Sequence, residues 1–169
     1  YRRAPVMRIL LRSAYRRADA TVALSRYARR NLELFGVPER DITLILPGAR
    51  IPEPLPETAI HAVRERFEIG NSRMVLAVGR FLPHKGHLTL VKAMPRVLER
   101  HPNTHLIMAG QGPCLEACLA KARALGIEGQ VHCPGHVDDA TLDGLYQACD
   151  VFALPIGADV REQGVGLVF

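Results

Sequence analysis

Residues 74–113 read MVLAVGRFLPHKGHLTLVKAMPRVLERHPNTHLIMAGQGP, and this stretch decides the fold. Two apolar runs, MVLAVG and HLIMAG, enclose the segment HLTLVKAMPRVLERH, in which apolar residues recur at helical spacing. A strand, a helix and a second strand in this order predict parallel strands joined by a crossover helix. Both strands are continuous apolar runs, which indicates that helices cover both faces of the sheet.

The same unit continues along the chain. CLEACLAKARALG is typical of a helix, VHCPG of a strand, DDATLDGLYQACD of a helix and VFALP of a strand. Four strands alternating with helices predict an α/β fold with a doubly wound, parallel, Rossmann-like sheet. In such sheets ligands bind at the carboxyl ends of the strands, so the loops after the strands are the candidate site.

The first 46 residues form a second, shorter α/β pattern. APVMRILLRSAYRRAD predicts an amphipathic helix with Arg8, Arg12 and Arg16 in one row. ATVALS and Ile42 to Leu46 read as buried strands. Between them, Ser25 is placed to cap the helix RYARRNLELFG, for which Gly36 is the stop.

A proline-rich stretch separates the two patterns. Residues 47–57, PGARIPEPLPE, contain four prolines and no periodic apolar pattern, which is typical of a connector. We therefore expect an N-terminal part at 1–46, a linker at 47–57 and a second domain at 58–169. That second domain should open with a helix, TAIHAVRERFEIG, closed by Gly70.

The charge is distributed unevenly between these parts. Residues 1–50 hold eleven arginines, no lysine and four acids, a net charge of +7, whereas residues 51–169 have a net charge of −2. The basic part suits either an anionic membrane surface or a solvated helix face. An arginine-rich nucleic-acid-binding protein is the less favoured reading, because the basic segment has few aromatic residues for base stacking.

The composition indicates a globular, cytoplasmic protein. No apolar run approaches the roughly 18 residues that span a bilayer, and the first residues lack the order of a signal peptide. Four cysteines are expected to be reduced thiols in the core: Cys114, Cys118, Cys133 and Cys149. A zinc site from Cys114, Cys118, His132 and Cys133 is disfavoured by its spacing.

The loop after the first strand of the second domain is GRFLPHKGH. Lys85 precedes a glycine instead of following one, so this is not a Walker loop, and the dinucleotide pattern GxGxxG is absent. Two cations remain, Arg80 and Lys85, on a short loop that leaves a buried strand. An arginine fork and a lysine point charge in this place are suited to a diphosphate.

The other loops offer backbone groups and glycines. Gly110 and Gly112 in AGQGP permit a sharp turn or a close approach, and the backbone around His136 and Val137 can face a flat ring. The long loop PIGADVREQGVG ends at Gly164 and Gly166, whose amides would bind an anion if they open a helix.

The motifs VGRFLPHKG, AGQGP, VHCPGHV, LYQACDVFALP and QGVGLVF, in this order, resemble the donor-binding domain of retaining glycosyltransferases of family 4, the GT-B class. The stretch ADATVALSRYARRNLELFGVPERDITLILPG resembles the end of their acceptor domain and the hinge. The resemblance implies that Arg80 and Lys85 are catalytic cations that bind the donor diphosphate. The implied donor-binding residues are Gly79, Gly110, Gly112, His136, Val137, Glu162, Gln163, Gly164, Val165 and Gly166.

The chain departs from the family pattern in three places. Gln163, with Glu162 before it, stands where the family has the first of two glutamates, and the second would lie beyond Phe169. Either residue is a candidate for the first glutamate's contact with the sugar. LPGAR replaces the usual hinge phrase. We therefore expect these residues to be the middle of a longer enzyme, with an incomplete donor domain and little turnover alone.

The resemblance implies a hexosyltransferase that moves a sugar from a nucleoside diphosphate sugar to an acceptor hydroxyl with retention, in polysaccharide or glycolipid biosynthesis. It implies no metal and no other cofactor, because cations and a helix N-terminus stabilise the leaving group. The expected partners are the donor and a carbohydrate or lipid-linked acceptor, with no nucleic acid, at a peripheral position on the inner membrane face. A non-catalytic sugar-nucleotide-binding subunit is the alternative.

Overall fold

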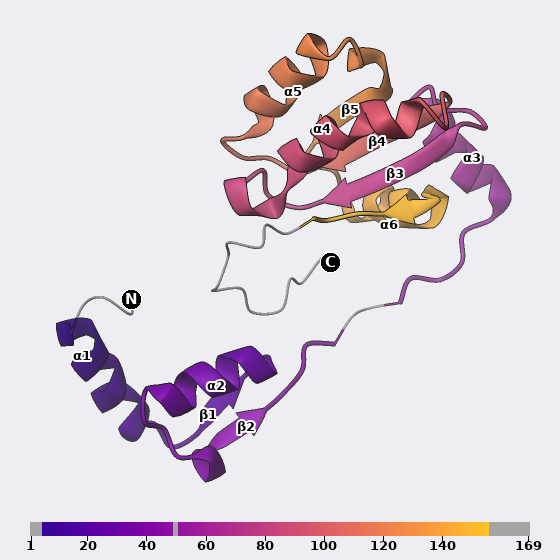
Figure 1. The fold of residues 1–169 in the computed structure, drawn as a ribbon. Helices are drawn as coiled ribbons and strands as arrows, with labels where there is room; N and C mark the ends of the chain where they lie inside the picture. The colour runs from indigo at the N-terminus through magenta and orange to yellow at the C-terminus, as the bar shows by residue number, and fades with distance from the viewer. Residues whose placement is uncertain (1–4, 49–50, 156–169) are drawn as a thin grey trace. The chain divides into compact units, whose positions relative to one another are not determined.

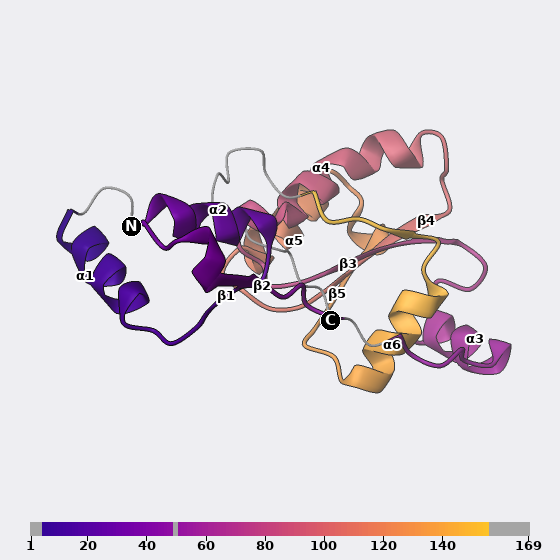
Figure 2. The same cartoon turned by 90° about the horizontal axis from the view of Figure 1, so that it is seen from below.

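The protein is described here by a computed structural model covering residues 5–48 and 51–155. These two stretches belong to two compact units, divided after Arg50. Figure 1 shows the elements of both units, and Figure 2 shows the same elements from below. Within the described ranges, no helix is long and apolar enough to cross a bilayer.

The first unit is a short strand–helix–strand pattern preceded by a helix. Strands β1 and β2 are parallel, with Thr21 opposite Ile42 and Ala23 opposite Leu44. The elements are α1 (Pro5–Arg16), β1 (Thr21–Ala23), α2 (Arg26–Leu34), η1 (Glu39–Asp41) and β2 (Ile42–Leu44). The predicted order of elements is therefore confirmed, although β2 ends two residues before Leu46.

Helix α2 begins where the sequence indicates. The Ser25 hydroxyl accepts a hydrogen bond from the Ala28 amide at 3.0 Å, which satisfies one of the free donors of the first turn. The helix packs on one face of the two strands around Ala23, Leu32 and Ile42. Val22 points the other way and is 50% exposed, so β1 alternates between buried and exposed residues and is not buried throughout as predicted.

The second unit is the predicted parallel α/β sheet. Its strands are β3 (Arg73–Val78), β4 (Thr104–Ala109), β5 (Val131–Gly135) and β6 (Val151–Phe152). Its helices are α3 (Glu57–Arg66), α4 (His87–Leu98), α5 (Leu115–Ala124) and α6 (Asp139–Ala148), with short 3-10 turns η2 (Pro83–Lys85) and η3 (Glu128–Gln130). Glu57, expected in the linker, is already the first residue of α3.

The four strands run parallel in the order β5-β4-β3-β6. Helices α4 and α5 cover one face of the sheet and α3 and α6 cover the other (Figure 1). Met74, Leu76, Leu106 and Ile107 are fully buried between these layers. The uninterrupted apolar runs of β3 and β4 are thus explained, whereas Val151 and Phe152 of β6 are exposed. The α/β doubly wound fold class is confirmed.

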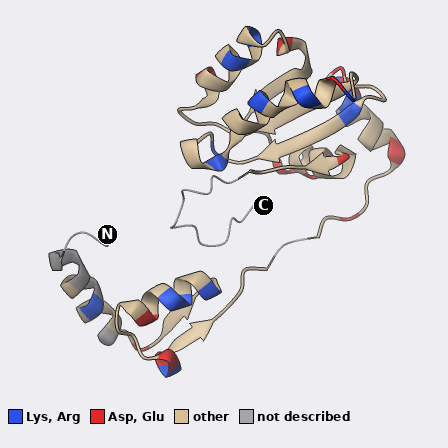
Figure 3. Cartoon of the chain, viewed as in Figure 1, with Lys and Arg blue, Asp and Glu red and all other residues tan. Residues whose placement is uncertain are grey.

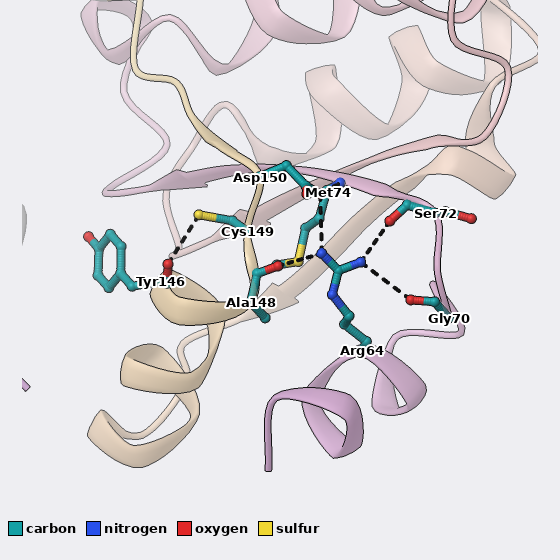
Figure 4. Close-up of polar contacts among 8 residues, drawn as sticks. All are labelled: Arg64, Gly70, Ser72, Met74, Tyr146, Ala148, Cys149 and Asp150. Carbon is teal, nitrogen blue, oxygen red and sulfur yellow. Dashed lines mark hydrogen bonds and ion pairs between the residues drawn. The ribbon is translucent and has the colours of Figure 1, made fainter. Parts of the chain in front are cut away.

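Polar contacts join the elements at the amino ends of β3 and β6 (Figure 4). The Arg64 guanidinium at the end of α3 donates to the carbonyl oxygens of Ser72 at 2.7 Å and Ala148 at 2.7 Å. It also donates to the Asp150 carboxylate at 3.2 Å, and that carboxylate accepts the Met74 amide at 2.7 Å. One side chain therefore ties together two helix ends and two strand starts.

Candidate functional site

The strand order locates the candidate site before any side chain is considered. The chain proceeds from β3 to β4 to β5 in one direction and then returns to place β6 on the other side of β3. The strand order therefore reverses between β3 and β6, and in open α/β sheets ligands bind at the carboxyl ends of the strands beside such a reversal. The loop after β3 contains Arg80 and Lys85.

These two cations lie on a compact turn between β3 and α4. Arg80 is exposed, and Lys85 is half-buried at the end of η2. The Leu82 amide donates to the Arg80 carbonyl oxygen at 2.8 Å, and the Lys85 amide donates to the Leu82 carbonyl oxygen at 3.0 Å. Neither cation has an ion-pair partner among the described residues (Figure 3 marks the charged positions). Two unneutralised cations on one ordered loop can bind an anion.

Gly110 and Gly112 are required for packing between the loops. A Cβ on Gly110 would lie 2.0 Å from the Gly79 carbonyl oxygen, and one on Gly112 would lie 2.6 Å from the Phe81 carbonyl oxygen. Backbone hydrogen bonds join the same segments, from Gly79 to Ala109 at 2.9 Å and from Phe81 to Gln111 at 2.9 Å. The close approach expected at these glycines is thus made by the neighbouring backbone. Their predicted contact with a donor stays a prediction.

The exit of β6 runs against the start of α4. Gly86 has φ +78°, and a Cβ there would lie 1.8 Å from the Pro155 carbonyl oxygen. Only glycine permits both this backbone conformation and this approach. The structure therefore brings the loop that holds Arg80 and Lys85 next to the beginning of the long loop after β6. The residues predicted on that long loop, Glu162 to Gly166, lie outside the described residues.

The loop after β5 carries the predicted ring-binding residues. His136 is exposed, whereas Val137 is half-buried and packs against the core around Leu145. Asp138 follows and caps α6, where its carboxylate accepts the Thr141 amide at 2.7 Å. That hydrogen bond, with the nearby charge of Arg66, lowers the Asp138 pKa and keeps the cap ionised. The Val137 side chain thus serves the core, and its backbone remains the candidate ligand contact.

The cysteines are free thiols in or beside the core. Burial raises the pKa of Cys118 and raises that of Cys133 to about 12, so both stay protonated and unreactive. His132 shares a hydrogen bond with His105, Nε2 to Nδ1 at 2.9 Å. Within the described ranges no three His, Cys, Asp or Glu side chains are grouped as metal ligands.

Sequence reasoning missed His87, the first residue of α4. It is 1% exposed, and its ring stacks on Phe81 with centroids 4.2 Å apart and planes at 15°. Neither ring nitrogen has a hydrogen-bond partner in the described part of the chain. The available signal was its position, four residues before Val91 and seven before Met94 on an otherwise apolar helix face.

Comparison with known families agrees with this architecture. The family model described as Glycosyl transferases group 1 matches residues 60–169, and the one described as Glycosyltransferase Family 4 matches residues 1–51. The chain belongs to the glycosyl transferases group 1 family. The expectation of a glycosyltransferase is therefore confirmed, and residues 1–51 match a separate family model.

Curated relatives share this assignment. The chain is 32% identical over 170 residues to the GDP-mannose-dependent alpha-(1-6)-phosphatidylinositol monomannoside mannosyltransferase of Mycolicibacterium smegmatis, covering 98% of this chain and 44% of the relative. It is 29% identical to mannosylfructose-phosphate synthase of Agrobacterium fabrum, covering 73% of this chain and 29% of the relative. The chain thus spans less than half the length of these relatives.

Solved structures share the fold. The Anabaena Alr3699/HepE protein in complex with UDP and glucose aligns with a TM-score of 0.74 at 21% identity, covering 88% of this chain and 40% of that one. WaaG, a glycosyltransferase involved in lipopolysaccharide biosynthesis, aligns with a TM-score of 0.67 at 21% identity, covering 80% and 37%. These likenesses confirm the expected α/β fold class of the GT-B type.

Proposed function

We propose that the protein is a glycosyltransferase that transfers a sugar, with mannose the first candidate, from a nucleoside diphosphate sugar to an acceptor hydroxyl with retention of configuration. One observation carries the proposal. Arg80 and Lys85 lie on a single ordered loop at the carboxyl end of β3, where the strand order reverses. Mannose is favoured by the names of the mycobacterial and Agrobacterium relatives.

The proposed catalysis is electrostatic. As the bond to the sugar breaks, negative charge develops on the diphosphate leaving group, and fixed cations stabilise it. The planar Arg80 guanidinium would donate two parallel hydrogen bonds to phosphate oxygens, and Lys85 would add a compact charge. This arrangement would need no metal ion. Retention is proposed from the family resemblance.

We assign the parts of the chain as the sequence predicted. Residues 1–46 would end an acceptor-side domain, residues 47–57 would be the linker and residues 58–169 would bind the donor. The backbones of Gly79, Gly110, Gly112, His136 and Val137 and the segment Glu162 to Gly166 are the proposed donor contacts. Because the chain spans 44% of its mycobacterial relative, we propose that turnover needs further sequence.

We also propose that the protein acts at an anionic membrane surface, on a carbohydrate or lipid-linked acceptor. In α1, Ile9 is 68% exposed and Leu10 is 59% exposed, and the Arg12 side chain is exposed nearby. An amphipathic helix with exposed apolar residues and arginines binds anionic lipid.

Sedimentation with vesicles containing phosphatidylglycerol should remove the full-length protein from solution, and added salt should release it. Equal sedimentation with neutral vesicles would exclude this electrostatic attachment.

Calorimetric titration tests the donor site. The full-length protein should bind at least one of GDP, UDP and ADP. Arg80→Ala and Lys85→Ala should each weaken that binding by about tenfold, since each removes a charged hydrogen bond worth about 1.4 kcal/mol or more. Lys92→Ala, an exposed lysine on α4, is the matched control and should bind as the wild type does.

Two results would contradict the proposal. If the protein binds none of the three nucleotides, it has no donor site of the proposed kind. If both loop variants bind nucleotide as the wild type does, the diphosphate does not bind at Arg80 and Lys85. A transfer assay with labelled GDP-mannose and membrane lipid then separates an enzyme from a binding subunit. If the full-length protein binds the nucleotide but transfers no sugar from any nucleoside diphosphate sugar, the non-catalytic reading holds.

A further inference from the structure

His87 stands at the junction between the candidate diphosphate loop and the core. As the first residue of α4 it shares a buried face with Val91 and Met94, both of which contact apolar side chains. The residue is 1% exposed. A histidine in this position is unusual, because an apolar side chain would fill the same space without a polar cost.

The His87 ring closes the loop at its base. Phe81 follows Arg80, and His87 follows Gly86, so the stack between the two rings joins the beginning of the loop to its end. The centroid distance of 4.2 Å and the 15° angle describe a nearly parallel arrangement. Five residues separate the two rings, and Lys85 is one of them.

The two ends of the loop are otherwise anchored to different elements. The Phe81 amide donates to the Gln111 carbonyl oxygen at 2.9 Å, and the Phe81 carbonyl oxygen accepts the Cys114 amide at 3.0 Å, which fixes Phe81 to the loop after β4. The Gly86 carbonyl oxygen accepts the Thr89 amide at 2.9 Å, which fixes Gly86 to α4. The stack is the side-chain contact that joins these two anchors.

Burying the polar ring of His87 costs free energy, and an apolar aromatic ring could form the same stack without that cost. Neither ring nitrogen has a hydrogen-bond partner among the described residues, and an unpartnered buried polar group costs about 1–3 kcal/mol. Burial, and then the nearby charge of Lys85, lower the His87 pKa, so the ring is neutral at pH 7. The core cluster that contains Phe81 and Val91 is apolar apart from the thiols of Cys118 within it and Cys114 packed against it.

We propose that His87 is a positioning residue for the donor diphosphate: its neutral ring, stacked on Phe81, holds the two ends of the loop together so that Arg80 and Lys85 face one ligand. This inference rests on the donor-binding function proposed above. Protonation of the ring would place a second positive charge beside Lys85 in an apolar site and loosen the stack. The loop would then bind a diphosphate less well in mildly acid solution.

Two substitutions separate the stack from the titration. His87→Phe keeps an aromatic ring on Phe81 but cannot be protonated, whereas His87→Ala removes the ring. At about pH 7.5 we expect GDP and UDP to bind His87→Phe within about twofold of the wild type and His87→Ala about tenfold more weakly, a loss typical of mispositioned charged groups. At about pH 5.5 the wild type should lose more affinity than His87→Phe. Protonation of the ligand's own phosphate affects both proteins equally, so the difference between them reports the protonation of His87.

A control variant and a ligand-free readout complete the test. Met94→Ala, on the same helix face two turns further on, should lower the melting temperature and leave nucleotide affinity unchanged. Hydrogen exchange of the amides at residues 80–86, measured without nucleotide, should be about tenfold faster in His87→Ala and unchanged in His87→Phe.

Three outcomes would overturn the inference. Equal nucleotide affinity of His87→Ala and the wild type would show that the ring does not position the cations. Weak binding by a folded His87→Phe would show that the imidazole nitrogens, and not the stack, are needed. Unchanged hydrogen exchange in His87→Ala would show that the loop does not depend on the ring. If the wild-type protein binds no nucleoside diphosphate, the proposed function fails while hydrogen exchange still decides the role of the stack.

Discussion

The two ends of the second unit's sheet are built differently. At the amino end, the Arg64 guanidinium is shared among two carbonyl oxygens at 2.7 Å and the Asp150 carboxylate (Figure 4). At the carboxyl end, Arg80 and Lys85 have no ion-pair partner among the described residues, and His87 is buried without a hydrogen bond. The amino end has the polar groups around Arg64 satisfied internally, whereas the carboxyl end leaves two cations for a ligand.

This difference suggests that charged residues at the amino end of the sheet stabilise the fold, whereas those at the carboxyl end bind a ligand. Satisfied buried polar groups stabilise a fold, and unsatisfied ones cost free energy unless a ligand completes them. A charged residue at the amino end should therefore affect unfolding, and a cation at the carboxyl end should affect ligand affinity. The backbone contacts at Gly110 are the exception, because they make part of the carboxyl end structural.

The largest expected effect is at the amino end. Arg64→Ala should lower the free energy of unfolding by about 3 kcal/mol, because it leaves the carbonyl oxygens of Ser72 and Ala148 without this donor, while Asp150 keeps only its hydrogen bond from the Met74 amide. Urea denaturation of the full-length protein measures it. Arg66→Ala is the matched control: Arg66 makes an exposed hydrogen bond to Thr141 and should change stability by less than about 0.5 kcal/mol. Equal losses in both variants would contradict the special role of Arg64.

The next effect tests the exception at the carboxyl end. Gly110→Ala should lower the free energy of unfolding by about 2 kcal/mol, because its Cβ would lie 2.0 Å from the Gly79 carbonyl oxygen. Gly79→Ala shares the positive φ but meets no atom within 4 Å, so it should cost only about 1 kcal/mol of backbone strain. Thermal unfolding of both variants gives the comparison. A Gly79→Ala protein as unstable as Gly110→Ala would show that strain, not the close approach, dominates.

The smallest effect concerns the histidine pair on β4 and β5. Burial lowers the pKa of His105, and burial together with His105 lowers that of His132, while Glu68 opposes this shift at His132. The folded protein therefore takes up protons less readily than the unfolded chain, so stability is complete above about pH 6.5 and falls below it. Between about pH 7.5 and pH 5.5, the free energy of unfolding of His105→Leu/His132→Leu should fall less than that of the wild type, as measured by urea denaturation. Parallel losses would assign the pH dependence to other groups, such as His87.

The sequence predicted the elements well because their signals are local. The continuous apolar strands, the Ser25 cap and the crossover helix over His87–Leu98 each depend on neighbouring residues. Arg80 and Lys85 were found because a cation after a buried strand is visible in the sequence. Arg64 was not found, because its partners Ala148 and Asp150 lie more than 80 residues away in the chain.

By itself, the sequence determined the α/β alternation, the family and the loop that carries the candidate cations, since periodicity and motif order are properties of the chain. Only the tertiary structure decided the order β5-β4-β3-β6, the packing role of Gly110 and the stack of His87 on Phe81. These features depend on which backbones approach one another. Such approaches are set by the packing of the whole sheet and its helices, which no short stretch of sequence records.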